Sequence, residues 1–147
     1  MNANLRLHYQ RQLIYAGLDD FNPNGVFPTY LAGRDGQSVN EWKREVAAFL
    51  DLGVRCGLIN ITNWERFSSY SKSVSVVDFL LGDDLCKNYQ LDEDVIWNSL
   101  YFFGTESLIR DLDKFGLRSW EALTFLENVS FLEFIQNKYR VIFFNVK

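Results

Sequence analysis

Only one histidine, two cysteines and two prolines occur in this chain of 147 residues. Because His8 is the single histidine, a Ser-His-Asp triad or a Cys-His pair would have to use this one residue as its base. His8 stands beside Leu7 and Tyr9 in a segment with helical periodicity, where we expect a surface or partly buried histidine. Catalysis that depends on histidine is therefore disfavoured.

The two cysteines, Cys56 and Cys86, stand 30 residues apart and have neither a second cysteine nor a histidine at metal-ligand spacing. A disulfide would need an oxidising compartment, which no other feature indicates, so we expect two buried free thiols. The turn Gly33-Arg-Asp-Gly36 lacks the Lys-Ser/Thr and the third glycine of phosphate-binding loops. We accordingly predict no metal site and no cofactor.

Long apolar runs are absent as well. No segment approaches the roughly 18 apolar residues that span a bilayer, and the N-terminus lacks the apolar stretch of a secretory signal. The net charge is −4, and the aromatic residues stand beside Leu and Val rather than Lys or Arg, which disfavours a nucleic-acid partner. We therefore expect a cytoplasmic protein with no membrane and no nucleic acid among its partners.

Aromatic residues are the abundant class, at 16% of a chain that is 48% apolar. A chain of this length buries about two-thirds of the surface that its unfolded form exposes, which predicts one core and a single domain over residues 1–147. Both prolines, Pro23 and Pro28, lie near the N-terminus, so later helices meet no proline break. We predict a mainly α fold, a bundle of about six or seven helices, with α+β as the alternative.

Apolar residues recur at spacings of three and four in several segments. The first such segment ends near Gly17, and the second begins at a capping box, Ser38 to Glu41, and ends near Gly57. Shorter helices are predicted from Thr62 to about residue 70 and from Ser75 to about residue 89.

Towards the C-terminus, helices over residues 92–103 and 105–115 are predicted to form an antiparallel hairpin. A last helix begins at Ser119 and can be interrupted at residues 128–130. The tail, residues 139–146, is rich in β-branched and aromatic residues, which predicts a short C-terminal strand. It either pairs with an extended segment at residues 26–31 or packs as extended chain.

The four tryptophans are assigned by their neighbours. Trp42, Trp97 and Trp120 fall on apolar helical faces and are predicted to lie in the core. Trp64 stands between Asn63 and Glu65 in a short predicted helix, so we expect it to be the exposed tryptophan.

Acidic residues are concentrated in one part of the chain. Residues 1–73 carry a net charge of +1, and residues 74–147 carry −5. Between Asp78 and Asp113, nine acidic side chains stand against two basic ones. Helix starts explain part of this run, and one interpretation is a solvated acidic face. The other interpretation is a docking surface whose field attracts a basic partner.

A mechanism that uses carboxylates alone is also considered, because paired Asp or Glu side chains hydrolyse glycosides or hold Mg²⁺ without histidine. The candidates are Asp83, Asp84 and residues 92–94. Residues 92–94, however, suit a helix start, adjacent carboxylates on a helix point in different directions, and the calcium-loop pattern is absent. Catalysis would need a pocket where two carboxylates converge, so we expect a protein that is not an enzyme.

The chain is thus small, acidic, helical and rich in aromatic residues, and it carries the stretch Trp42, Phe49-Leu50, Gly53 and Gly57-Leu58-Ile59. In these features it resembles the immunity proteins of bacterial toxin–immunity pairs, including those of contact-dependent inhibition systems. The resemblance implies a protein that binds a cognate toxin domain, often a basic nuclease, and blocks its active site or substrate groove.

The candidate contact residues are Asp83, Asp84, Tyr89, Asp92, Glu93 and Asp94. The carboxylates would supply the electrostatic contact and Tyr89 an aromatic anchor, with Trp97 and Tyr101 as further amphipathic side chains. The second hypothesis is a non-catalytic adaptor or regulatory subunit that contacts another cellular protein through the same face, as a monomer or a homodimer.

Overall fold

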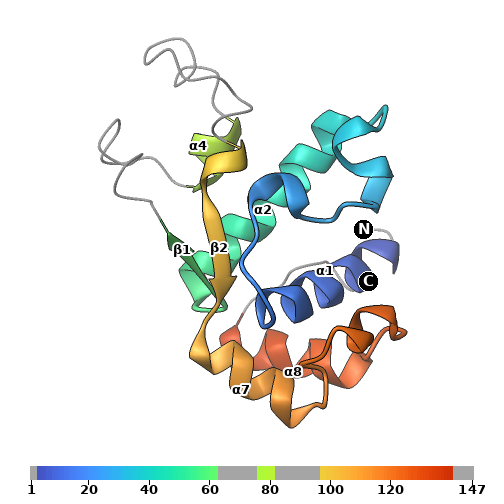
Figure 1. Ribbon diagram of the computed structural model, residues 1–147, viewed down its shortest axis with the longest axis vertical. Coiled ribbons are helices and arrows are strands. Elements are labelled where there is room, and N and C mark those ends of the chain that lie inside the picture. Colours follow the sequence, from blue (N-terminus) through green and yellow to red (C-terminus); the bar gives the residue numbers. More distant parts are fainter. Residues whose placement is uncertain (1–2, 63–75, 82–96, 141–147) are drawn as a thin grey trace.

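The computed structural model describes residues 3–62, 76–81 and 97–140 (Figure 1). The predicted fold class is confirmed, since the chain is mainly helical and has one small antiparallel sheet. The buried apolar side chains of the described segments form one cluster. No helix among the described residues is both long and apolar enough to cross a membrane.

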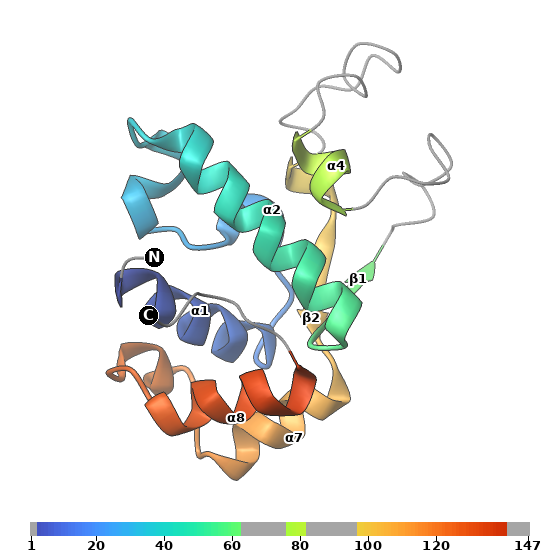
Figure 2. The same cartoon turned by 180° about the vertical axis from the view of Figure 1, so that it is seen from behind.

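The N-terminal helix, α1 (Ala3–Ala16), agrees with the prediction. Leu5, Tyr9 and Leu13 lie on one buried face because of their spacing, and Ile14 and Gln10, further round the helix, are buried as well. The helix ends at Gly17, whose N–H donates to the carbonyls of the last turn. In both views α1 lies between α2 (Val39–Cys56) and the pair α7 (Glu106–Lys114) and α8 (Val129–Tyr139) (Figures 1 and 2).

Helix α2 buries the predicted face, including Trp42, Val46 and Phe49, and it ends at Gly57. Gly57 has φ of +87°, the left-handed conformation that closes a helix and that favours glycine. The predicted capping box is wrong, because the Ser38 side chain makes no capping hydrogen bond. Ser38 has ψ of 35° rather than the extended value that aims its hydroxyl at the first turn, and its carbonyl alone accepts from Trp42 N–H.

The predicted extended segment at residues 26–31 is also wrong. Residues 26–29 form a bend and a turn between two short 3₁₀ helices, η1 (Pro23–Gly25) and η2 (Tyr30–Asp35). Phe27 has φ of +50°, which a strand does not accommodate. The carbonyls of Val26 and Phe27 accept from Trp42 Nε1 at 3.1 and 3.0 Å, so a buried indole takes the place of a neighbouring strand.

The sheet pairs β1 (Ile59–Thr62) with β2 (Tyr101–Gly104), with Ile59 opposite Gly104 and Thr62 opposite Tyr101. The predicted helix over residues 92–103 is therefore wrong in its second half, although residues 97–99 are helical. The predicted helical hairpin is wrong as well, since a strand precedes α7. Burial alternates along β2, as expected for a strand with one face on the core.

Between the two strands in sequence, α4 (Val76–Leu81) confirms the beginning of the helix predicted from Ser75 to about residue 89 and packs on α2 (Figure 2). The rest of that predicted helix lies outside the described residues. The Leu80 carbonyl accepts from Trp97 Nε1 at 3.1 Å. Thr62 ends β1, and the rest of the helix predicted to follow it, including Trp64, lies outside the described residues.

The C-terminal third agrees more closely with the sequence. Helix α7 (Glu106–Lys114) begins at Thr105, whose Oγ1 accepts from Leu108 N–H, and it ends before Gly116. The predicted interruption near residue 128 is confirmed, because η3 (Glu121–Thr124) is separate from α8 (Val129–Tyr139). The predicted C-terminal strand lies, after Tyr139 and Arg140, outside the described residues.

Candidate functional site

The predicted contact residues lie outside the described residues: Asp83, Asp84, Tyr89, Asp92, Glu93 and Asp94. Two further side chains were predicted as anchors for a partner. The prediction is wrong for Trp97, because its ring is fully buried against that of Trp42 at a centroid distance of 5.6 Å. Tyr101 is exposed on β2, so it remains available to a partner.

Three described acidic residues between Asp78 and Asp113 contribute to the structure of the protein itself. Glu106 lies in the first turn of α7, where the positive end of the helix dipole stabilises its negative charge. Asp113 pairs with Arg118 at 2.7 Å, and Asp111 is 5% exposed and turned into the protein. This part of the run serves the fold rather than a partner.

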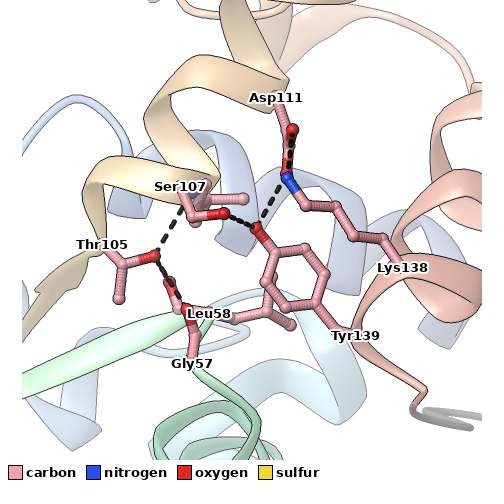
Figure 3. Close-up of polar contacts among 8 residues, drawn as sticks. Gly57, Leu58, Thr105, Ser107, Asp111, Lys138 and Tyr139 are labelled. Carbon is pink, nitrogen blue, oxygen red and sulfur yellow. Dashed lines mark hydrogen bonds and ion pairs between the residues drawn. The ribbon is translucent and has the colours of Figure 1, made fainter.

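Asp111 is the centre of a polar network between α7 and α8 (Figure 3). Lys138 Nζ donates to both carboxylate oxygens at 2.8 and 2.9 Å, and the Tyr139 hydroxyl donates to Oδ2 at 2.7 Å. Because the one hydroxyl proton of Tyr139 is used on Asp111, Ser107 donates to the Tyr139 oxygen at 2.6 Å. Burial, opposed by the Ser107 bond and aided by Asp111, raises the pKa of Tyr139 to about 12.

The start of α7 is fixed from the other side by Thr105. Its Oγ1 donates to the Gly57 carbonyl at 2.8 Å and, more weakly, to Leu58 at 3.3 Å, and it accepts from Leu108 N–H (Figure 3). Every hydroxyl in this region uses its proton within the protein. The network therefore joins helices and leaves no hydroxyl placed as a nucleophile.

A pocket of about 530 Å³ lies over one side of α1. Its floor is His8, Arg11, Gln12 and Tyr15, at the i, i+3, i+4 and i+7 positions of one helical face. We call this pocket the α1 groove. Its volume falls in the range of sites that hold small ligands.

One wall of the α1 groove is the loop over residues 20–29. The floor holds this wall directly, since Gln12 Oε1 accepts from Phe27 N–H at 3.1 Å and the Tyr15 ring meets Phe21 edge-on. The Asn22 side chain accepts from Gly25 N–H and closes the turn at η1. Tyr101 of β2 also lines the groove, so the sheet reaches it through Tyr101.

The facing wall is formed by the segment over residues 120–129, which contains η3 and from which Leu123 lines the groove. Gln10, fully buried on α1, donates to the Leu126 carbonyl at 3.0 Å and accepts from Asn128 N–H at 2.6 Å. At the other end of the segment, the Trp120 ring lies 5.6 Å from that of Tyr15. The segment thus runs antiparallel to α1 and is held at both ends.

This segment also exposes apolar side chains. Its exposed members are Trp120, Phe125, Leu126 and Val129, which we call the apolar segment. Trp120 is 55% exposed and Leu126 is 84% exposed, so the prediction of Trp120 as a core residue is wrong. The predicted long helix from Ser119 would have turned Trp120 inward, whereas the short η3 leaves only its edge against Tyr15.

The polar groups of the α1 groove are unevenly satisfied. Arg11 Nε is buried and has no hydrogen-bond partner in the part of the chain that the structure describes. Burial, and then the charge of Arg11, lower the pKa of His8, so His8 is a neutral imidazole near neutral pH. Asp20 is the one carboxylate of the lining and is exposed.

Chemistry at this site is limited by that inventory. The described part of the groove does not bring two carboxylates together, and no group of three His, Cys, Asp or Glu among the described residues is arranged to hold a metal. Cys56 is a free, half-buried thiol whose pKa is raised by burial, and Cys86 lies outside the described residues. What the groove offers is a cationic donor, a neutral imidazole and aromatic walls.

Comparisons with protein-family models, with curated proteins and with solved structures find no match to this chain. The function is therefore argued from the site alone. Sequence reasoning treated His8 in isolation and missed the groove, although His8, Arg11, Gln12 and Tyr15 stand at spacings that place them on one helical face. That stripe of polar and aromatic residues along α1 was the available signal.

Proposed function

We propose that this chain is an immunity-type protein of the cytoplasm, which binds and neutralises a toxin domain by covering it. The observation that carries the proposal is the apolar segment, four exposed apolar side chains within ten residues of one another. Contiguous exposed apolar side chains mark interaction sites in soluble proteins. Trp120 in particular is the residue type that most often dominates interface energy.

Two contributions to binding are separated along the chain. The apolar segment supplies short-range affinity, since covering a leucine as exposed as Leu126 yields about 1.5–3 kcal/mol. The acidic residues between Asp83 and Asp94 supply attraction to a basic toxin domain over a distance of about one Debye length. The first contribution acts on dissociation and the second on association.

The test begins with a tagged chain used to capture partners from its native cells at about 50 and 200 mM salt, with mass spectrometry and sizing of the complex. A stoichiometric partner whose toxic activity falls to zero at equimolar chain supports neutralisation. A partner that has no toxic activity supports the adaptor hypothesis instead, and failure to capture any partner at either salt overturns both.

Variants can test the apolar and the acidic contributions to binding separately. Leu126→Asp should raise the dissociation rate at least about tenfold, whereas Leu81→Asp, a matched change at an exposed leucine of α4, should not. Reversal of Asp83, Asp84 and residues 92–94 to lysine should slow association and remove its salt dependence. Unchanged association after charge reversal would contradict the acidic contact.

A further inference from the structure

We infer that the α1 groove is a binding site for a small aromatic carboxylate, with Arg11 as the group that receives the carboxylate. This inference does not depend on the proposed function, because the groove would hold such a ligand whether or not a toxin domain covers the apolar segment. Four observations on the groove carry it, namely its volume, its walls, the state of Arg11 and the balance of donors and acceptors.

The size and walls of the groove favour a flat apolar body. A volume of about 530 Å³ accommodates a ligand of one or two rings, in the range typical of small-molecule sites. Tyr15 of α1 and the exposed Tyr101 of β2 supply aromatic surface, and Phe21 and Phe27 are buried behind it. Rings of a ligand can stack on some of these faces and meet others edge-on, which is the geometry that aromatic pairs prefer.

The state of Arg11 favours an anion. Its Nε is buried without a partner among the described residues, and a buried donor in that state carries the full cost of its desolvation. The rest of the guanidinium belongs to a half-buried side chain of the groove lining, where its terminal nitrogens would donate charge-assisted hydrogen bonds to the two oxygens of a carboxylate. The floor helix thus holds a donor that the described residues do not satisfy.

The other polar side chains of the floor are consistent with one negative charge. Gln12 uses its oxygen on Phe27 N–H, which leaves its NH₂ group as a donor to the groove. His8 is neutral and its ring meets that of Tyr30 edge-on at 5.4 Å. Asp20 is exposed, so water screens its charge at the rim. A single arginine suits a monocarboxylate better than a phosphate, which carries more charge.

The experiment titrates the full chain with 2-naphthylacetate and with its neutral amide by isothermal calorimetry. We expect saturable binding of the acid and at least about tenfold weaker binding of the amide, because the amide forfeits the charge-assisted bond. Arg11→Met should abolish the difference between the two ligands, and Arg11→Lys should retain part of it. Arg44→Met, an equal loss of charge at an exposed position of α2, should leave both affinities unchanged.

Equal binding of acid and amide, unchanged binding in folded Arg11→Met, or absence of saturation by either ligand would overturn the inference. A peptide that ends in a tryptophan with a free carboxylate presents the same chemistry from a protein source. Binding of that peptide without binding of the free acid would overturn the assignment to a small molecule. Thermal unfolding of each variant verifies that the chain is folded.

Discussion

The α7–α8 network and the α1 groove each hold a charged side chain, but only the one in the network, Asp111, has all of its buried polar atoms hydrogen-bonded. Asp111 is a buried charge whose two oxygens accept three hydrogen bonds, and the hydroxyls around it all have partners. Arg11 is a charge whose buried Nε has no partner in the described part of the chain. Buried polar groups are nearly always satisfied, and Arg11 Nε departs from that rule on the lining of a groove, where we propose that another molecule completes the site. The comparison assigns Asp111 to stability and Arg11 to binding.

The largest expected effect is on the satisfied side of this comparison. Asp111→Ala should lower the free energy of unfolding by about 2–3 kcal/mol, because Tyr139 and Lys138 lose their acceptor, although Lys138 regains solvent. Urea denaturation measures the change. Asp113→Ala breaks an exposed pair with Arg118 and should cost less than about 1 kcal/mol. Equal losses in the two variants would contradict a structural role specific to Asp111.

Gln10 tests whether the groove wall depends on satisfied groups in the same way. Gln10→Leu should lower stability by about 2 kcal/mol, since the Leu126 carbonyl and Asn128 N–H both lose a buried partner. Hydrogen exchange should then increase at residues 126–128. The same change at exposed Gln37 serves as the control and should be close to neutral. A neutral Gln10→Leu would mean that other contacts hold the wall.

Substitution of Arg11, unlike that of Asp111 or Gln10, should not lower the stability of the protein. Arg11→Met removes an unsatisfied donor and keeps an apolar chain of similar length, so the free energy of unfolding should stay within about 1 kcal/mol of the original value or rise. Thermal and urea unfolding measure this. A loss as large as that of Asp111→Ala would break the comparison, because it would show that Arg11 is a structural charge.

The smallest effect concerns pH. The folded pKa of His8 is lowered, so the unfolded chain takes up the proton first, and the stability that neutral His8 contributes is present above pH 6.5 and is lost as the pH falls through the folded pKa. His8→Gln should therefore reduce the loss of stability between about pH 7 and pH 5. Urea denaturation at a series of pH values tests this, and identical pH profiles would contradict it.

The sequence was most informative where a signal is local. Helices α1, α2 and α7 repeat apolar residues at helical spacing, and they end at Gly17, at Gly57 and just before Gly116, signals that are local in the sequence. The capping box at Ser38 carries a sequence signal of the same kind, yet it fails, because the hydrogen bond depends on a backbone angle that the preceding loop sets. Local pattern predicted the helix but not its cap.

Elements that need a distant partner were beyond the sequence. Strands β1 and β2 are four residues each, too short for periodicity to distinguish them from helix, and Thr62 pairs with Tyr101 far along the chain. Trp120 was assigned to the core because it falls on an apolar face of a predicted long helix, but that helix is replaced by η3 and α8, and Trp120 is exposed. Both errors arise from tertiary context that overrides local preference.

By itself, the sequence determined the mainly helical class, the faces that α1, α2 and α7 bury, and the excess of acid in the second half of the chain. It placed His8, Arg11, Gln12 and Tyr15 on one helical stripe, but a stripe is not a pocket. Only the tertiary structure decided that this stripe becomes the floor of a pocket, because the walls of the pocket come from residues 20–29 and from the segment with Leu123. The physical reason is that burial and hydrogen-bond satisfaction depend on neighbours in space, which the order of residues along a chain does not specify.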